Sequence, residues 1–265
     1  MIADPLSMGY IGGMDVFKFN FWACPLVIIL LLSSAAFARA DSGDSDSGDS
    51  ASLVCSGAAK AELLPAETAT AAFKGVEEFY KALKTLRSSF VQHSYFLGLD
   101  QMVTSKGELH FKRPGLMRWD YREPEKQLFV SDGEKVYFYQ PQLKQVSVGE
   151  FKEAFSSELP VSFLLGIAKL SENFSLESAC RNTSGILLNL SPKNPDPNLS
   201  RLSLLVAADN YRPLAFKVVD IGANETTILL PGATFGGELE DALFSFAIPK
   251  GVDVLGYSAR TVPSS

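Results

Sequence analysis

Residues 105–141 read SKGELHFKRPGLMRWDYREPEKQLFVSDGEKVYFYQP, and their pattern is the clearest indication of the fold. Apolar and polar side chains alternate in and beside it, in short runs at Met102–Phe111, Leu116–Tyr121, Gln127–Val130 and Val136–Tyr139. A period of two is typical of β-strands. Turn sequences such as Arg-Pro-Gly and Asp-Gly separate the runs. Because connections this short join antiparallel neighbours, the stretch predicts consecutive antiparallel strands.

A helix is predicted before this stretch, over residues 67–89, because apolar side chains recur there at spacings of three and four. A strand is predicted next, at Phe90–Tyr95. Residues 150–172 then interrupt the strands. They predict a helical turn near Phe151 and a second helix with Pro160 in its first turn, which would carry Phe163, Leu164, Ile167 and Leu170.

Strands resume after the second predicted helix. The same alternation places them at Phe174–Ala179, Ile186–Leu190, Leu199–Val206, Leu214–Ile221, Thr226–Leu230 and Leu243–Ile248. With about eleven strands and few helices, the predicted class is α+β with one large antiparallel sheet. A sheet of that size must curl, split or close.

Several predicted strands are apolar on both faces. Leu187 and Leu188 are neighbours in one strand, and Leu204 and Leu205 are neighbours in another. A sheet with one side in solvent would alternate more cleanly, so both faces must contact apolar partners. The helices can cover one face. The pattern leaves two alternatives for the other face, a packed sandwich core or an internal apolar cavity.

The N-terminal region, residues 1–40, has the features of a secretory signal peptide. Lys18 precedes an apolar run from Leu26 to Leu32, and an Ala-x-Ala cleavage pattern ends at Ala40. The apolar run is shorter than a bilayer span. We therefore expect cleavage after Ala40 and export to the bacterial periplasm, with an uncleaved membrane anchor as the alternative.

The region after the cleavage site, residues 41–64, is expected to be a disordered leader. It is rich in Asp, Ser and Gly, and such a composition cannot bury apolar surface. The folded domain is predicted over residues 65–255, with a C-terminal tail at 256–265. Cleavage leaves Cys55 and Cys180, which can form one disulfide in an oxidising compartment. The sequence leaves this pairing open.

The charge and the side chains argue against several classes of function. The net charge is −6, and a mildly acidic chain is a poor candidate for binding nucleic acid or an anionic membrane surface. His93 and His110 have no metal-binding spacing. The chain contains neither a Gly-x-Ser-x-Gly nor a His-Glu-x-x-His motif. We therefore expect no enzyme activity, no metal and no cofactor.

Residues 105–141 resemble the signature region of the LolA family, the periplasmic outer-membrane lipoprotein carriers. The shared features are a Gly-x-Leu strand that ends in Lys-Arg-Pro, a strand with Trp119 and an aromatic residue two positions on, a turn at Pro124, a Val-Ser-Asp-Gly turn, and an aromatic strand that ends at Pro141. Matches outside the stretch are Phe-Val-Gln at 90–92, and Phe-Ser-Phe shortly before Pro-Lys-Gly-Val near the C-terminus. The resemblance covers residues 73–255.

The resemblance implies an open half-barrel, in which a strongly curved antiparallel sheet carries helices as a lid over an apolar cavity. It implies that the protein binds the acyl chains of lipoproteins, without a cofactor and as a monomer. The implied partners are an inner-membrane lipoprotein-releasing ABC transporter and an outer-membrane lipoprotein receptor. The Asp/Ser/Gly leader and Cys55 are not part of the family pattern.

The resemblance also implies roles for individual residues. In the family, the Arg of Lys-Arg-Pro holds the lid through hydrogen bonds to loop backbone, and this role falls here on Arg113. Strand alternation adds candidates for the cavity lining, each of which is equally a candidate for ordinary core: Leu109, Phe111, Met117, Trp119, Tyr121 and Phe138. The candidates for the lid are Phe163, Leu164 and Ile167.

The same fold could serve two other functions, of which the sequence leaves one open and disfavours the other. A periplasmic carrier or sensor of another lipid or glycolipid is the main alternative, because it too needs only an apolar cavity. An outer-membrane lipoprotein receptor would need a lipidated cysteine directly after the apolar run of the signal. Asp41 follows the cleavage site instead, which disfavours the receptor.

Overall fold

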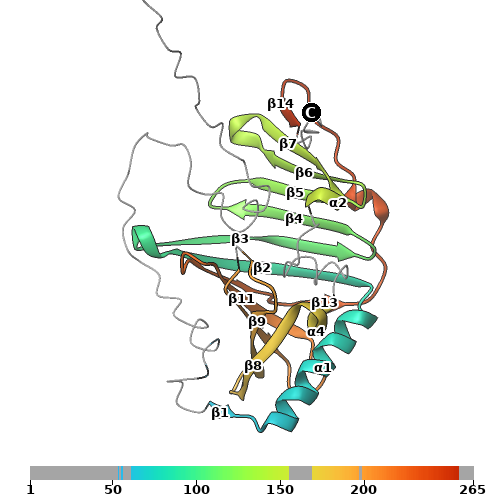
Figure 1. Cartoon of the computed structure of the whole chain (residues 1–265). Coiled ribbons are helices and arrows are strands. Elements are labelled where there is room, and N and C mark those ends of the chain that lie inside the picture. The colour runs from blue at the N-terminus through green and yellow to red at the C-terminus, as the bar shows by residue number, and fades with distance from the viewer. Residues whose placement is uncertain (1–52, 54, 56–60, 155–168, 197–198, 257–265) are drawn as a thin grey trace, which may run out of the picture.

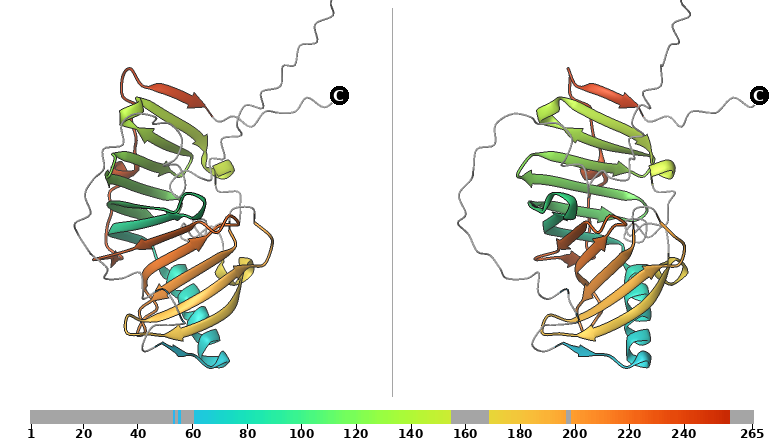
Figure 2. Two further views of the ribbon diagram at one scale, coloured as in Figure 1. Left: turned by 90° about the vertical axis from the view of Figure 1, so that its left-hand side faces the viewer. Right: turned by 60° about the vertical axis from the view of Figure 1, so that its left-hand side comes forward.

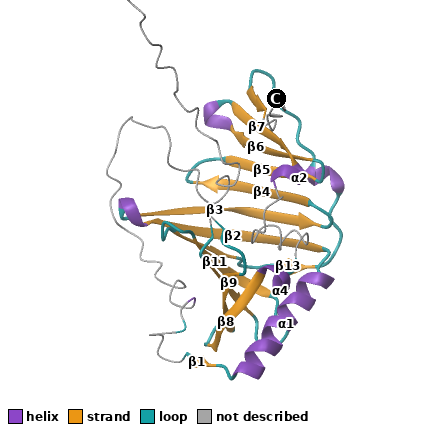
Figure 3. Cartoon of the chain, in the orientation of Figure 1, coloured by secondary structure: helices purple, strands orange, loops and turns teal. Residues whose placement is uncertain are grey.

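The computed structural model describes residues 53, 55, 61–154, 169–196 and 199–256. Within them, strands dominate and helices are few (Figures 1 and 3). The helices are α1 Ala66–Ala82, α2 Phe151–Ala154 and α4 Leu170–Asn173, with short 3-10 turns η3 Leu97–Leu99, η4 Pro141–Leu143 and η5 Asp241–Phe244. The predicted signal peptide, most of the predicted leader, and all but Gly256 of the tail predicted at 256–265 lie outside the described residues.

The strands form one sheet of 14 strands. They are β1 Glu62–Leu63, β2 Thr85–Phe96, β3 Gln101–Lys112, β4 Leu116–Glu123, β5 Gln127–Asp132, β6 Lys135–Gln140, β7 Gln145–Glu150, β8 Phe174–Arg181, β9 Ile186–Pro192, β10 Arg201–Val206, β11 Pro213–Val219, β12 Glu225–Leu229, β13 Thr234–Phe235 and β14 Asp253–Gly256.

The strand order is β1-β8-β9-β10-β11-β12-β2-β3-β4-β5-β6-β7-β14, and β13 adds to β2. Every pairing is antiparallel except β7 with β14, which is parallel. The predicted class, a large and largely antiparallel sheet with few helices, is therefore confirmed. Figure 2 shows that the half formed by β3–β7 is turned relative to the half formed by β8–β11, so the sheet is open and curved.

The predicted count of about eleven strands is too low. The sequence pattern misses β1, β7, β13 and β14, which are short or weakly alternating and become strands through their pairing with β8, β6, β2 and β7. The strand predicted at Leu243–Ile248 is wrong, because η5 extends into this segment as far as Phe244 and residues 245–248 form no strand. Phe246 lies against the rings of Tyr137 and Tyr139 on β6, and the carbonyl oxygen of Leu243 accepts a hydrogen bond from Arg118 on β4, so the segment crosses the sheet instead of pairing with one strand.

The helix predicted over 67–89 is also too long. Helix α1 ends at Ala82, and Leu83 already has an extended backbone. Leu86 and Phe90 belong to β2, which pairs with β3 along its whole length. Their spacing of four fits both a helix repeat and the even positions of a strand, and so cannot separate the two. The predicted helical turn near Phe151 is confirmed as α2.

One large cluster of buried side chains lies on the face of the sheet that carries α1, which we call the inner face. Helix α1 contributes Ala72, Phe73, Val76 and Tyr80 to it, and contacts β8 and β9. The rest of the cluster comes from both halves of the sheet. The packed side of this sheet is therefore continuous from β8 to β6.

The opposite face, the outer face, is covered in part by the C-terminal strap, residues 234–256. The strap begins as β13 beside β2 and ends as β14 beside β7. Between them, Lys112 Nζ donates to the carbonyl oxygen of Leu239 over 2.7 Å and lies 2.6 Å from Asp241 Oδ1. Phe244 in η5 is buried. The strap thus ties the strands of one half together from outside.

The N-terminal segment also reaches the outer face, upstream of the domain boundary predicted at residue 65. Cys55 is joined to Cys180 of β8 by a disulfide, with a Cα–Cα distance of 5.7 Å. Leu53 is only 4% exposed and packs with Cys180, Leu187 and Leu205 in a second, smaller cluster. Strand β1 then adds to the edge of β8. The folded domain therefore includes residues that composition assigned to the leader.

Candidate ligand-binding face

The six residues predicted to line a cavity all lie on the inner face. Each is 4% exposed or less and belongs to the main cluster: Leu109, Phe111, Met117, Trp119, Tyr121 and Phe138. The register brings them together, because Leu109 pairs with Trp119 and Phe111 pairs with Met117. Trp119 in turn pairs with Phe129, which pairs with Phe138. Strand alternation therefore grouped these side chains correctly.

Three aromatic rings form the centre of this face. The ring centroid of Phe90 lies 5.1 Å from that of Trp119 and 4.9 Å from that of Tyr121. The rings of Trp119 and Tyr121 are stacked at 6.2 Å. Because aromatic side chains bury large areas and pack in such tilted and offset arrangements, this trio makes the inner face both apolar and well ordered.

A polar group lies within this apolar face. The Tyr121 hydroxyl donates to Oε1 of Gln92 over 3.0 Å, and Gln92 Nε2 donates to Ser94 Oγ over 3.1 Å. Gln92 is 1% exposed. Sequence reasoning did not single out Gln92 or Phe90 as site residues. The signal was present, since alternation in β2 puts both on the same face, but an isolated polar residue in a strand usually faces solvent.

The Lys-Arg-Pro turn links two distant parts of the chain to the sheet. Lys112 reaches the C-terminal strap, as described above. Arg113 Nη1 donates to the carbonyl oxygen of Lys81 over 3.3 Å, in the last turn of α1, and its backbone N–H donates to Lys84 over 2.9 Å. A cation near the C-terminal end of a helix is favourable. Arg113 therefore holds the end of α1 against the sheet.

The Nε atom of Arg113 does not take part in this contact with α1. This atom is buried and has no hydrogen-bond partner among the described residues. Burial lowers the pKa of Arg113, and the neighbouring Tyr80 acts in the opposite direction. Burial also raises the pKa of the Tyr80 hydroxyl well above its ordinary value. Arg113 is thus a half-buried cation that keeps a free donor beside the inner face.

The predicted lid residues Phe163, Leu164 and Ile167 lie outside the described residues. The described residues on either side of them do reach the inner face. Ala154 in α2 packs against the main cluster, and Leu170 in α4 is fully buried in it. The described residues on both sides of the segment 155–168 therefore lie at the apolar face.

The Val-Ser-Asp-Gly turn of the signature stretch is structural. Ser131 Oγ donates to the carbonyl oxygen of Gly115 over 2.7 Å, which joins two turns at the same end of the sheet. Asp132 Oδ1 accepts hydrogen bonds from the backbone N–H groups of Glu134 and Lys135. Gly133 adopts a φ of 90°, a conformation that favours glycine. These residues shape the hairpin between β5 and β6.

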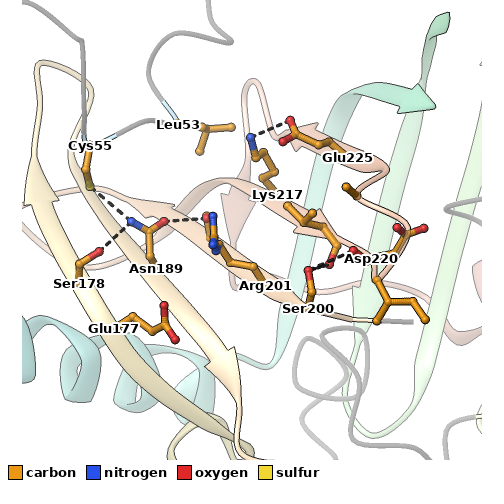
Figure 4. A pocket seen from close by; sticks show the side chains of 14 residues that line it. Leu53, Cys55, Glu177, Ser178, Asn189, Ser200, Arg201, Lys217, Asp220 and Glu225 are labelled. Carbon is orange, nitrogen blue, oxygen red and sulfur yellow. Dashed lines mark hydrogen bonds and ion pairs between the residues drawn. The ribbon is translucent and has the colours of Figure 1, made fainter. Parts of the chain in front are cut away.

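A cleft of about 640 Å³ lies on the outer face, over β8–β12 (Figure 4). Most of the residues that line it are polar or charged. Asn189 Nδ2 donates to Ser178 Oγ over 3.0 Å, and Ser203 Oγ donates to Asn189 Oδ1 over 2.8 Å. Lys217 and Glu225 form an ion pair at 2.8 Å. Charged and polar groups that pair with one another make this cleft a poor receptor for acyl chains.

The two histidines differ in burial. Among the described residues, no group of three His, Cys, Asp or Glu side chains is placed to hold a metal ion. His93 Nδ1 lies 3.0 Å from Thr104 Oγ1 on the outer face. His110 is 7% exposed, and burial lowers its pKa. In the described part of the chain, no helix is long and apolar enough to cross a membrane.

The fold and the inner face define the class of protein. Its members have a single open, curved sheet with few helices and an apolar inner side. Sequence comparison then identifies the family. The model of the outer membrane lipoprotein carrier protein LolA matches residues 81–247, so the chain belongs to the LolA family. The resemblance seen in residues 105–141 is thereby confirmed.

Two relatives show how far the similarity extends. The outer-membrane lipoprotein carrier protein of Chromohalobacter salexigens is 30% identical over 200 residues, which is 75% of this chain and 93% of the relative. The protein of the same name from Bordetella pertussis is 32% identical over 196 residues, 72% of this chain and 89% of the relative. The match therefore spans almost the full length of these relatives.

Solved structures are similar at a lower level. An uncharacterized conserved protein from Thermus thermophilus has 13% identity and a TM-score of 0.46, covering 72% of this chain and 99% of that one. A LolA superfamily protein from Nitrosomonas europaea has 10% identity and a TM-score of 0.39, covering 67% of this chain and 97% of that one. The family assignment rests on the sequence matches alone.

Proposed function

We propose that this chain is a periplasmic carrier that binds the acyl chains of lipoproteins released from the inner membrane and delivers them to a receptor at the outer membrane. The observation that carries the proposal is the continuous apolar inner face, with Phe90, Trp119 and Tyr121 at its centre, in a chain of the LolA family. No cofactor or catalytic step is required, because the cargo is bound and released unchanged.

The inner face supports binding that can be reversed. A buried methylene contributes about 0.8 kcal/mol, so the acyl chains of a lipoprotein represent tens of kcal/mol of hydrophobic transfer. The inner-face side chains already bury one another, since Trp119 and Tyr121 are both 4% exposed. Acyl chains must displace these contacts, and the displaced packing offsets part of the gain. Release to an acceptor that has no such competition is then downhill.

Arg113 is our candidate for the residue that stabilises the empty, closed form. Its guanidinium presents several donors in a fixed fork. One donor already holds the carbonyl oxygen of Lys81, and Nε is unused among the described residues. A backbone carbonyl of the segment at 155–168 is the partner that we propose for it. Arg113 would then join α1, the sheet and the lid in the closed form.

Phe163, Leu164 and Ile167 are our candidates for the lid. The support is the position of the flanking residues, because Ala154 and Leu170 both lie against the inner-face cluster. A charge at one of these positions, as in Phe163→Asp or Leu164→Asp, should lower uptake of a triacylated lipopeptide far more than it lowers the free energy of unfolding. Equal losses of uptake and stability would show instead that these side chains are ordinary core.

The proposed partners are acylated lipoproteins, an inner-membrane lipoprotein-releasing ABC transporter and an outer-membrane lipoprotein receptor, with the carrier acting as a monomer. The decisive test is native mass spectrometry of the protein purified from a bacterial periplasm, with identification of the extracted lipid. A bound triacylated lipoprotein supports the proposal. A free lipid or glycolipid would indicate the alternative, a carrier or sensor of another lipid. A protein that is empty and takes up no acylated probe contradicts both.

A further inference from the structure

The large apolar side chains that remain exposed are concentrated at one end of the strands. Five of them lie in or beside three turns, and we call them the apolar rim: Leu97, Leu99, Met102, Leu143 and Ile221. Their exposed fractions are 51%, 56%, 56%, 54% and 71%. Scattered single apolar residues on a surface need no explanation, but a set gathered on one side marks an interaction site.

Strand pairing brings the three turns to the same end of the sheet. The turn β2–β3 contains Leu97 and Leu99, the turn β6–β7 contains Leu143, and the turn β11–β12 contains Ile221. The turns β2–β3 and β11–β12 are in direct contact, because the backbone N–H of Leu97 donates to Asn224 Oδ1 over 3.1 Å. The turns β2–β3 and β6–β7 are both at the left in Figure 1. At a strand spacing of about 4.8 Å, the row is roughly 30 Å long.

The opposite end of the same strands has a different character. Its turns are at 113–115, 133–134, 182–185 and 207–212, and none of the exposed large apolar side chains of the described chain lies in them. The other exposed large apolar residues are in the edge strands β1 and β14 or in the strap. Among the described turns between strands, exposed large apolar side chains therefore occur only at this end of the sheet, in three of its turns, whereas the β4–β5 turn at 124–126 has none.

Two of the turns have the same construction. The 3-10 turn η3 ends in Leu99 and is followed by Asp100 with a φ of 48°, and η4 ends in Leu143 and is followed by Lys144 with a φ of 49°. Both turns are closed by a backbone hydrogen bond, from Asp100 to Leu97 and from Lys144 to Pro141. The same backbone thus presents a leucine outward at two separated points.

The closing hydrogen bonds lower the cost of placing these turns against an apolar phase. A backbone N–H or C=O that leaves water without a partner costs several kcal/mol. Here, Asp100 and Lys144 donate within their own turns, and Ala223 donates to the carbonyl oxygen of Asp220 in the third. The N–H group that closes each turn therefore keeps its partner when the leucine and isoleucine side chains are buried.

The charged residues of the three turns indicate which kind of partner surface the apolar rim could bind. The turns carry Asp100, Lys144 and Asp220, so they form no cationic patch that would bind anionic lipids. A partner with an extended surface is needed to reach side chains spread along the whole row. We propose that the apolar rim docks the protein on the surface of a zwitterionic phospholipid bilayer, with these side chains inserted at the interface. This inference goes beyond cargo binding, since the rim and the inner face are different surfaces.

The test is flotation of the periplasmically purified protein with vesicles of zwitterionic phosphatidylcholine and phosphatidylethanolamine. We expect the protein to float with the vesicles at low salt and equally in 0.5 M salt. The double variant Leu99→Ser/Leu143→Ser should reduce the partition coefficient at least about tenfold. Leu63→Ser is the matched control, because Leu63 is 69% exposed on the edge strand β1, and it should leave partition unchanged.

Three results would overturn the bilayer proposal. They are a wild-type protein that does not float, a rim variant that floats as well as wild type, and binding that requires anionic lipid and disappears in salt. Thermal unfolding of each variant, followed by circular dichroism, confirms that it is folded. Uptake of a triacylated lipopeptide is measured in parallel. If the wild-type protein floats with the vesicles but takes up no lipopeptide, the proposed carrier function is contradicted while the proposed docking surface is still supported.

Discussion

Phe90 and Gly107 are paired residues on β2 and β3, and the Phe90 ring occupies the space that a side chain on Gly107 would need. A Cβ built on Gly107 would lie 2.8 Å from Cε1 of Phe90 and would also collide with the backbone carbonyl of Asp120. The glycine of the Gly-x-Leu strand therefore has a packing role. It lets an aromatic ring lie across the neighbouring strand at the centre of the inner face.

Gly107→Ala should lower the free energy of unfolding by about 1–3 kcal/mol, because an added methyl group forces the Phe90 ring or the strand to move. Urea denaturation measures the change. Gly98→Ala is the matched control, since nothing lies within 4 Å of the position that its Cβ would take. We expect its effect to stay within about 0.5 kcal/mol. Similar losses in both variants would refute the packing role.

The disulfide between Cys55 and Cys180 should be a major source of stability. It closes a loop with a sequence separation of 125 residues. By loop-closure entropy, a cross-link over a loop of that size contributes up to about 5 kcal/mol. Reduction should therefore lower the urea midpoint of the wild-type protein. The double variant Cys55→Ser/Cys180→Ser should unfold at the lower urea midpoint with or without reductant. A shift of its midpoint on adding reductant would mean that reductant does not act through this disulfide.

Acidification should destabilise the protein through His110. Burial lowers the pKa of this imidazole, Glu108 opposes the shift, and Arg87 and Arg118 add to it. The folded state thus binds a proton less readily than the unfolded state. The contribution to stability is complete above the unfolded pKa of about 6.5 and is lost as the pH falls through the lower folded pKa. The unfolding free energy of His110→Gln should therefore fall less between pH 7.5 and pH 5 than that of wild type, and parallel curves would contradict this.

Arg113→Leu should leave the fold intact and impair the release of cargo. If the guanidinium stabilises the closed empty form, its loss favours the loaded form. Hydrogen bonds to charged groups contribute about 1.5–3 kcal/mol, so transfer of a triacylated lipopeptide to a receptor should fall about tenfold or more. Uptake should be unchanged or increased. Arg113→Lys keeps the charge without the fork and should restore transfer only in part. Normal transfer by Arg113→Leu would exclude the proposed role.

The Lys-Arg-Pro turn shows both the reach and the limit of the sequence pattern. The pattern located the turn and singled out Arg113 as a residue with a role beyond the turn itself. It did not indicate that Lys112 holds the C-terminal strap or that Arg113 contacts the last turn of α1. Both partners are far away in the sequence, and hydrogen bonds to backbone carbonyls leave no trace in residue type. Such contacts become visible only when the chain is folded.

The short strands give the same lesson for the fold. β7 and β14 exist because each adds to an available strand edge, and the segment after Glu240 forms a turn because Phe244 and Phe246 pack across the sheet. Six to eight residues of alternation are a local signal, whereas an edge that needs a partner is a property of the assembled sheet.

Residue patterns were enough to identify the family, the antiparallel strands of the signature stretch and the grouping of Leu109, Trp119 and Phe138 on one face, because turn chemistry and a period of two are local properties. The tertiary structure alone decided that this face is the one covered by α1, that Gln92 is buried within it, and that the N-terminal segment is anchored on the outer face by Cys55. These outcomes depend on which distant segments pack together, and alternation is identical for a strand viewed from either side.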